Sequence, residues 1–76
     1  MNIDRLITMA NDIAAFFDAE GEAEAAGSIA AHLQKFWEPR MRAQIIAHEQ
    51  AGGAGLRQSV RAAVRLLPPP ARGGAA

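Results

Sequence analysis

Two histidines, His32 and His48, are the first residues to consider for chemistry, because imidazole binds metals and moves protons near neutral pH. His48 is followed by Glu49, which is how the zinc motif H-E-x-x-H begins, but Gly52 stands where the second histidine would be. The motif needs two imidazoles one helical turn apart. A zinc site is therefore not expected, and no other residues form a catalytic, cofactor-binding or metal-binding pattern.

An acidic stretch raises a second possibility, a calcium site. Its members alternate along the chain: Asp18, Glu20, Glu22 and Glu24. A helix–loop–helix calcium loop needs glycine at its sixth position and glutamate at its twelfth. Gly21 is only the fourth residue from Asp18. The stretch is more typical of a solvated acidic turn.

Arg57, Arg61 and Arg65 recur every four residues and predict a basic stripe on one helix face. Such a stripe can meet nucleic-acid phosphates. The chain is neutral overall, however, and no aromatic residue lies between the arginines. A solvated face, or a face that meets an acidic patch on a protein, is the favoured interpretation. A small helical nucleic-acid-binding regulator is the alternative function.

The run from Lys35 to Arg42 is the best candidate for a partner-binding site. It joins two aromatic residues to a proline and two arginines, and tryptophan and arginine are enriched at interface hot spots. We expect Phe36 to belong to the core and Trp37 to be shared between core and partner. The candidate partner-binding residues are Phe36, Trp37, Glu38, Pro39, Arg40 and Arg42.

These candidates need helices to position them, and apolar spacing predicts four. The first helix spans about residues 2–19, with Asn2 as N-cap and with Met9 and Phe16 widening its apolar stripe. The second runs from about Glu22 to Phe36, where Gly27 permits a close approach to the first helix or marks a late start capped by Ser28. The third spans about residues 39–50, from Pro39 to Gly52-Gly53. The fourth spans about residues 56–67 and stops at Pro68.

The expected fold class is therefore all-α, a small bundle of three to four helices. We expect one helical domain over residues 1–67, followed by a disordered Pro/Gly-rich tail over residues 68–76. The chain has no cysteine, so neither a disulfide nor a thiolate metal site can cross-link and stabilise the fold. Eighteen of the 38 hydrophobic residues are alanine, which buries little area. A partner chain is the remaining source of stability.

Charge is unevenly distributed along the 76 residues. Residues 1–38 hold seven acidic and two basic residues, a net of −5, whereas residues 39–76 hold six arginines and one glutamate, a net of +5. The halves either face each other in the fold or orient docking to a partner. No signal peptide or bilayer-spanning run is visible, so a cytoplasmic location is expected.

Three segments of the chain resemble the formate dehydrogenase delta subunit family. Residues 9–17, Met-Ala-Asn-Asp-Ile-Ala-Ala-Phe-Phe, resemble its N-terminal motif. Residues 35–42, Lys-Phe-Trp-Glu-Pro-Arg-Met-Arg, look like its most distinctive block, and residues 48–56 look like its third. The likeness covers about residues 1–66.

The resemblance implies an accessory subunit of a soluble, cytoplasmic, NAD-dependent formate dehydrogenase. In such enzymes a large alpha subunit carries a molybdenum or tungsten bis-pterin cofactor and iron–sulfur clusters, while other subunits hold FMN and the NAD site. The delta chain is expected to carry no cofactor and to bind the large subunit, supporting its assembly, cofactor loading or stability. A structural role and a role in cofactor insertion both remain open.

Overall fold

The computed structural model describes residues 2–69, and every regular element among them is helical. The helices are α1 (Ile3–Phe17), α2 (Glu22–Phe36), α3 (Pro39–Gln50) and α4 (Gln58–Leu66), with one short 3-10 turn, η1 (Asp18–Glu20). The expected all-α class is confirmed. None of the described helices is long and apolar enough to cross a bilayer.

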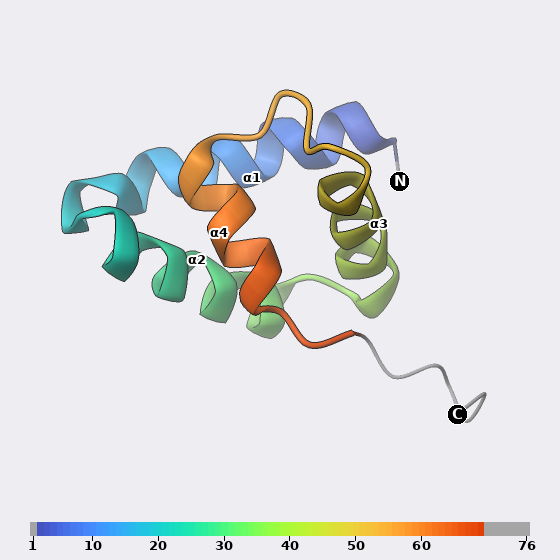
Figure 1. The fold of residues 1–76 in the computed structure, drawn as a ribbon. Coiled ribbons are helices and arrows are strands. Elements are labelled where there is room, and N and C mark those ends of the chain that lie inside the picture. Colours follow the sequence, from blue (N-terminus) through green and yellow to red (C-terminus); the bar gives the residue numbers. More distant parts are fainter. Residues whose placement is uncertain (1, 70–76) are drawn as a thin grey trace.

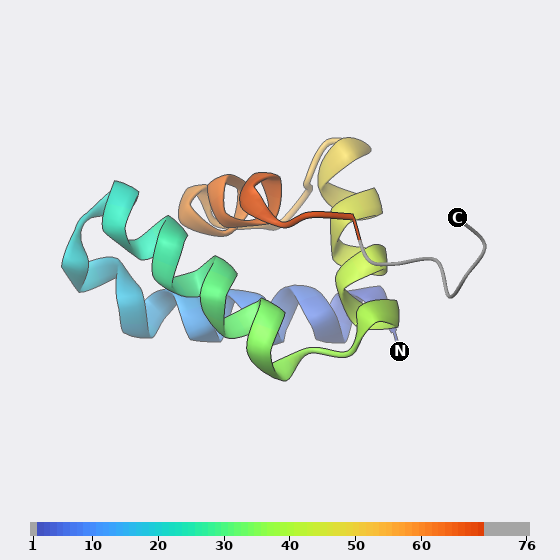
Figure 2. The same cartoon turned by 90° about the horizontal axis from the view of Figure 1, so that it is seen from below.

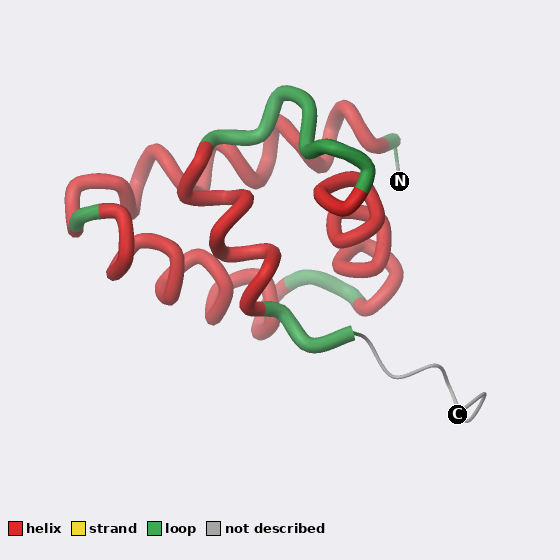
Figure 3. Tube along the Cα trace, viewed as in Figure 1, coloured by secondary structure: helices red, strands yellow, loops and turns green. Residues whose placement is uncertain are grey.

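The first two helices form an antiparallel hairpin that carries the rest of the fold (Figure 1). Helix α3 closes one end of this hairpin, and α4 packs across α2 at an angle (Figure 2). The loops that join these helices are short, except the one between α3 and α4 (Figure 3). Packing of α4 on α2 is the most extensive contact between elements.

Local sequence signals set most helix ends. The Asn2 side chain accepts a hydrogen bond of 2.7 Å from the backbone N–H of Asp4, so the predicted N-cap is confirmed. Gly21 ends the hairpin turn with φ of 99°, a left-handed value that favours glycine. Pro39 occupies the first turn of α3 after an extended Glu38, as the sequence predicts.

Helices α1 and α4 are shorter than predicted. Helix α1 ends at Phe17 and tightens into η1, while α4 begins at Gln58 because Arg57 is extended, with ψ of 154°. At the other end Leu67 is also extended, with ψ of 131°, as expected of a residue before proline. The predicted tail begins at Pro68; Pro68 and Pro69 have no regular structure, and residues 70–76 lie outside the described residues.

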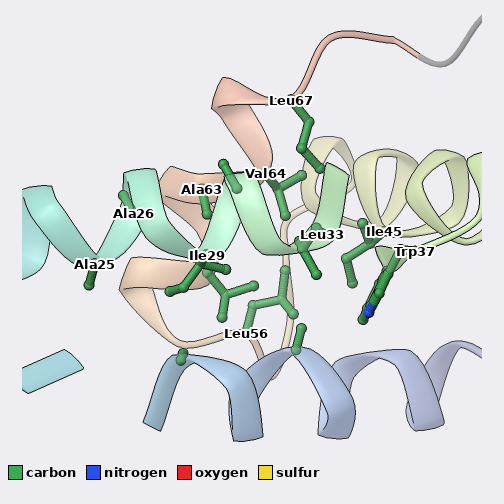
Figure 4. Packing of buried hydrophobic residues seen from close by; sticks show 14 of the residues in the cluster. Ala25, Ala26, Ile29, Leu33, Trp37, Ile45, Leu56, Ala63, Val64 and Leu67 are labelled. Carbon is green, nitrogen blue, oxygen red and sulfur yellow. The ribbon is translucent and has the colours of Figure 1, made fainter. Parts of the chain in front are cut away.

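The core joins all four helices, and six of its fifteen buried residues are alanine (Figure 4). Its largest fully buried side chains are Leu6, Ile29, Leu33, Ile45 and Val60. The buried alanines are Ala10, Ala14, Ala25, Ala26, Ala30 and Ala63. Small side chains let helices approach closely, but they bury little apolar area. The helices are therefore closely packed around a core that contributes little stability for the chain's length.

Two predictions about the hairpin are wrong. Phe16, expected to widen the buried stripe of α1, is 79% exposed, because it lies two residues from buried Ala14 and so on nearly the opposite face. Gly27 neither admits α1 nor starts the helix. It lies inside α2, and a Cβ built on it has no neighbour within 4 Å. Ser28 is not a cap; its hydroxyl donates to Glu20 Oε1 over 2.8 Å.

Candidate partner interface

Four ring side chains make a continuous ladder across the seam between α1 and α2. Phe16 contacts Phe17 edge-on with ring centroids 5.0 Å apart, and Phe17 contacts His32 at 6.3 Å. His32 lies 4.7 Å from Phe36, whose ring is approached by the Lys35 ammonium at 5.7 Å. The ladder (Phe16, Phe17, His32 and Phe36) therefore displays aromatic surface from residues that the chain separates by up to 20 positions.

A groove of about 510 Å³ lies beside this ladder. Its lining comes from three helices and the α2–α3 corner: Met9, Asp12, Ile13, His32, Phe36, Trp37 and Met41. Met9, Ile13 and Met41 are partly buried and pack against the core, so the groove has a largely apolar surface. Asp12 is its one acidic lining residue. The groove joins residues from two sequence segments, 9–17 and 35–42, that were identified separately.

Phe36 and Trp37 occupy different places from those expected. Phe36, expected in the core, is 64% exposed. Trp37, expected to be shared between core and partner, is only 6% exposed and packs in the core near Ile45 (Figure 4). Trp37 still lines the groove with its remaining edge. Of the two aromatic residues, Phe36 is thus the one available to a partner.

The other candidate partner-binding residues lie at the α2–α3 corner outside the groove. Glu38, Pro39 and Arg40 are exposed, and Glu38 caps α3 without a side-chain hydrogen bond. Arg42 is half-buried, and its Nε has no hydrogen-bond partner among the described residues. The structure brings Phe36 and Trp37 to the groove, but it does not bring these four side chains there.

The arginine stripe on α4 is largely engaged within the fold. Arg57 lies 3.5 Å from Asp18, and Arg65 Nε donates to Glu49 over 2.8 Å. Arg61 packs over Gly53, where a built Cβ would meet its Nε at 3.0 Å. Two of the three guanidinium groups therefore have internal acidic partners, which weighs against a row of free charges for phosphates.

His48, Glu49 and Asp18, which the sequence offered for chemistry, make contacts within the fold instead. His48 Nε2 lies 2.7 Å from the carbonyl oxygen of Ala54, and Glu49 is 9% exposed beside Arg65. Asp18 accepts a 2.6 Å hydrogen bond from Ser59, so the acidic turn is not merely solvated. Within residues 2–69, no three histidine, aspartate or glutamate side chains are grouped to hold a metal.

Asn11 is a contact residue that the sequence analysis did not single out. Its Nδ2 donates to the carbonyl oxygen of Gly55 over 2.9 Å, and its Oδ1 accepts from the backbone N–H of Arg57 over 3.0 Å. A single side-chain amide thus binds two backbone groups of the loop that precedes α4, one acceptor and one donor. Its only sequence signal is a polar residue next to the apolar stripe of α1, which is too common to identify such a role.

A comparison with protein-family models gives a match over most of the chain. The family model described as NADH-dependant formate dehydrogenase delta subunit FdsD matches residues 5–64 of the 76. The matched region runs from the first turn of α1 into the last turn of α4 and includes the groove, the ladder and the Asn11 contact. No curated protein and no solved structure matches the chain.

Proposed function

The chain belongs to the delta subunit family of NADH-dependent formate dehydrogenases, and from this membership we propose that it is a non-catalytic accessory subunit binding the large, molybdenum-containing subunit. The family match over residues 5–64 is the observation that carries the proposal. Binding of the large subunit would support its assembly, cofactor loading or stability. The molybdenum or tungsten bis-pterin, the iron–sulfur clusters, FMN and NAD are then cofactors of the partner subunits.

The placement of reactive side chains supports an accessory role. His48, Glu49 and Asp18 are engaged in contacts that hold the helices together. The chain has no cysteine, so it cannot supply thiolate ligands to an iron–sulfur cluster. Its exposed aromatic residues, in contrast, are of the kind that protein interfaces bury.

Co-expression with the other enzyme subunits tests the proposal. A tag on this chain should co-purify the large subunit. Omission of the chain should lower the yield of assembled complex, the molybdenum or tungsten content per large subunit, or both. The two readouts separate an assembly role from a cofactor-loading role. Formate-dependent NAD reduction by the purified chain alone, or an unchanged complex without it, would contradict the proposal.

A further inference from the structure

We infer that the groove beside the aromatic ladder takes an amphipathic helix of the large subunit, with apolar side chains in the groove and a lysine or arginine opposite Asp12. The inference rests on the proposed function and adds to it the surface used and the chemistry of the segment it binds. Its starting point is exposure: of three large hydrophobic side chains that are mostly exposed, two, Phe16 and Phe36, belong to the ladder.

Clustered aromatic exposure of this kind indicates a binding surface. A lone exposed apolar side chain needs no explanation, whereas a contiguous apolar patch on a soluble protein marks an interaction site. Here the ladder continues into the apolar lining of Met9, Ile13 and Met41. Aromatic and methionine side chains are also the types that interface cores favour.

Charge identifies the polar part of the partner. Asp12 is exposed and has neither an ion pair nor a hydrogen bond to another side chain within residues 2–69, although Asp18 and Glu49 both have arginine partners. The groove lining includes Asp12 but no lysine or arginine, and the nearby Lys35 ammonium is engaged over the Phe36 ring at 5.7 Å. A basic side chain flanking the apolar anchors is therefore complementary to this surface, and an acidic one is repelled.

Backbone geometry favours a helix as the bound element. An extended segment that adds to a sheet needs an exposed strand edge, and residues 2–69 contain no strand. A polyproline segment, which needs only an aromatic-lined groove, is the extended occupant that the cross-link described below must exclude. The walls of the groove are helices whose main-chain groups are already paired. A helix pairs its own main chain and presents side chains alone, which is how apolar helix faces bind grooves between helices.

The principal test measures binding of full-length variants to the large subunit of the co-expressed complex. Phe36→Ala should weaken binding about tenfold or more, because it truncates an aromatic anchor. Leu66→Ala is its matched control, since Leu66 is 60% exposed on α4 and does not line the groove. Circular dichroism of each variant should match the wild-type spectrum, because both side chains are exposed.

The charge term is tested separately. Asp12→Asn should weaken binding severalfold. It should also reduce the dependence of binding on salt, because salt screens the attraction of a basic partner residue to the Asp12 carboxylate and the amide carries no charge. Glu24→Gln, which removes an exposed acid outside the groove, should leave both quantities unchanged. If Asp12→Asn binds with wild-type affinity and wild-type salt dependence, the proposed segment does not place a basic residue opposite Asp12.

A cross-link identifies the bound segment directly. A photoreactive phenylalanine analogue in place of Phe36 should label one helical segment of the large subunit that carries a lysine or arginine. Labelling of an extended segment would overturn the helix. If the wild-type chain and Phe36→Ala bind the large subunit equally well, the groove is not the binding site, but the proposed function stands. If the wild-type chain does not bind, the proposed function itself fails.

A second copy of this chain is the competing occupant. Sedimentation of the purified chain distinguishes it: a monomer supports the inference. A dimer that Phe36→Ala dissociates, with binding to the large subunit unchanged, would assign the groove to self-association and overturn the inference.

Discussion

Phe36 and Trp37 are adjacent, yet one is exposed and the other buried. The buried row of α2 runs through Ala25, Ile29 and Leu33 at intervals of four, and Trp37 is the next member of that row. Phe36 is three residues after Leu33 and lies beside the row. A spacing of three or four residues fits both positions. The sequence therefore could not show which of the two side chains is buried, because that depends on how α3 packs on the hairpin.

The first prediction compares these two neighbours. Trp37→Ala should lower the free energy of unfolding by about 3–5 kcal/mol, because it leaves a large cavity in a buried site. Phe36→Ala should change it by about 0.5 kcal/mol or less, as exposed positions usually do. Urea denaturation followed by circular dichroism gives both values. A Trp37→Ala chain of wild-type stability that no longer binds would show that the indole serves the partner rather than the core.

At the scale of helices, a helix end could be predicted from the sequence where local residues determine it, but not where a contact with another helix determines it. The bounds of α2 and α3 were predicted correctly, because Gly21, Pro39 and Gly52-Gly53 act locally. The start of α4 was predicted two residues early, because Asn11 holds the backbone of Arg57 from another helix. The groove was missed for the same reason: its lining comes from segments that only the tertiary fold brings together.

The second prediction uses two glycines of opposite structural role. Gly27→Ala should raise the free energy of unfolding by about 0.5–1 kcal/mol, because alanine favours the helix and the added methyl group meets no neighbour. Gly53→Ala should lower it by about 1–2 kcal/mol, because φ is 66° there. Thermal denaturation of each variant, compared with the wild type, shows whether the free energy of unfolding rises or falls. Destabilisation by Gly27→Ala would mean that another part of the chain approaches that site.

For the whole molecule, one of the two roles of charge asymmetry that the sequence left open has an observed contact, and a role in docking stays a prediction. Arg57 pairs with Asp18 across the two halves, but Glu49 and Arg65 pair within the basic half. Asp12 has no such charge partner among the described residues. A typical interface takes about 800 Å² from each partner, roughly a sixth of the 4709 Å² that this chain exposes. An interface of typical size would therefore cover a large share of this small surface.

The final prediction concerns the stability of the chain alone and in complex. A 76-residue chain with an alanine-rich core and no disulfide should be helical but of low thermal stability by itself. Binding to the folded state at a partner concentration one hundred times the Kd adds about 2.7 kcal/mol. For a domain of this size that raises the Tm by roughly 10–20 °C. Circular dichroism of the free chain, and hydrogen exchange of its amides with and without the large subunit, measure the difference.

Phe36→Ala should reduce the gain in protection while leaving the Tm of the free chain unchanged, which ties the added stability to the groove. A high Tm for the free monomer, or equal protection in both states, would show that the chain does not depend on a partner for its stability.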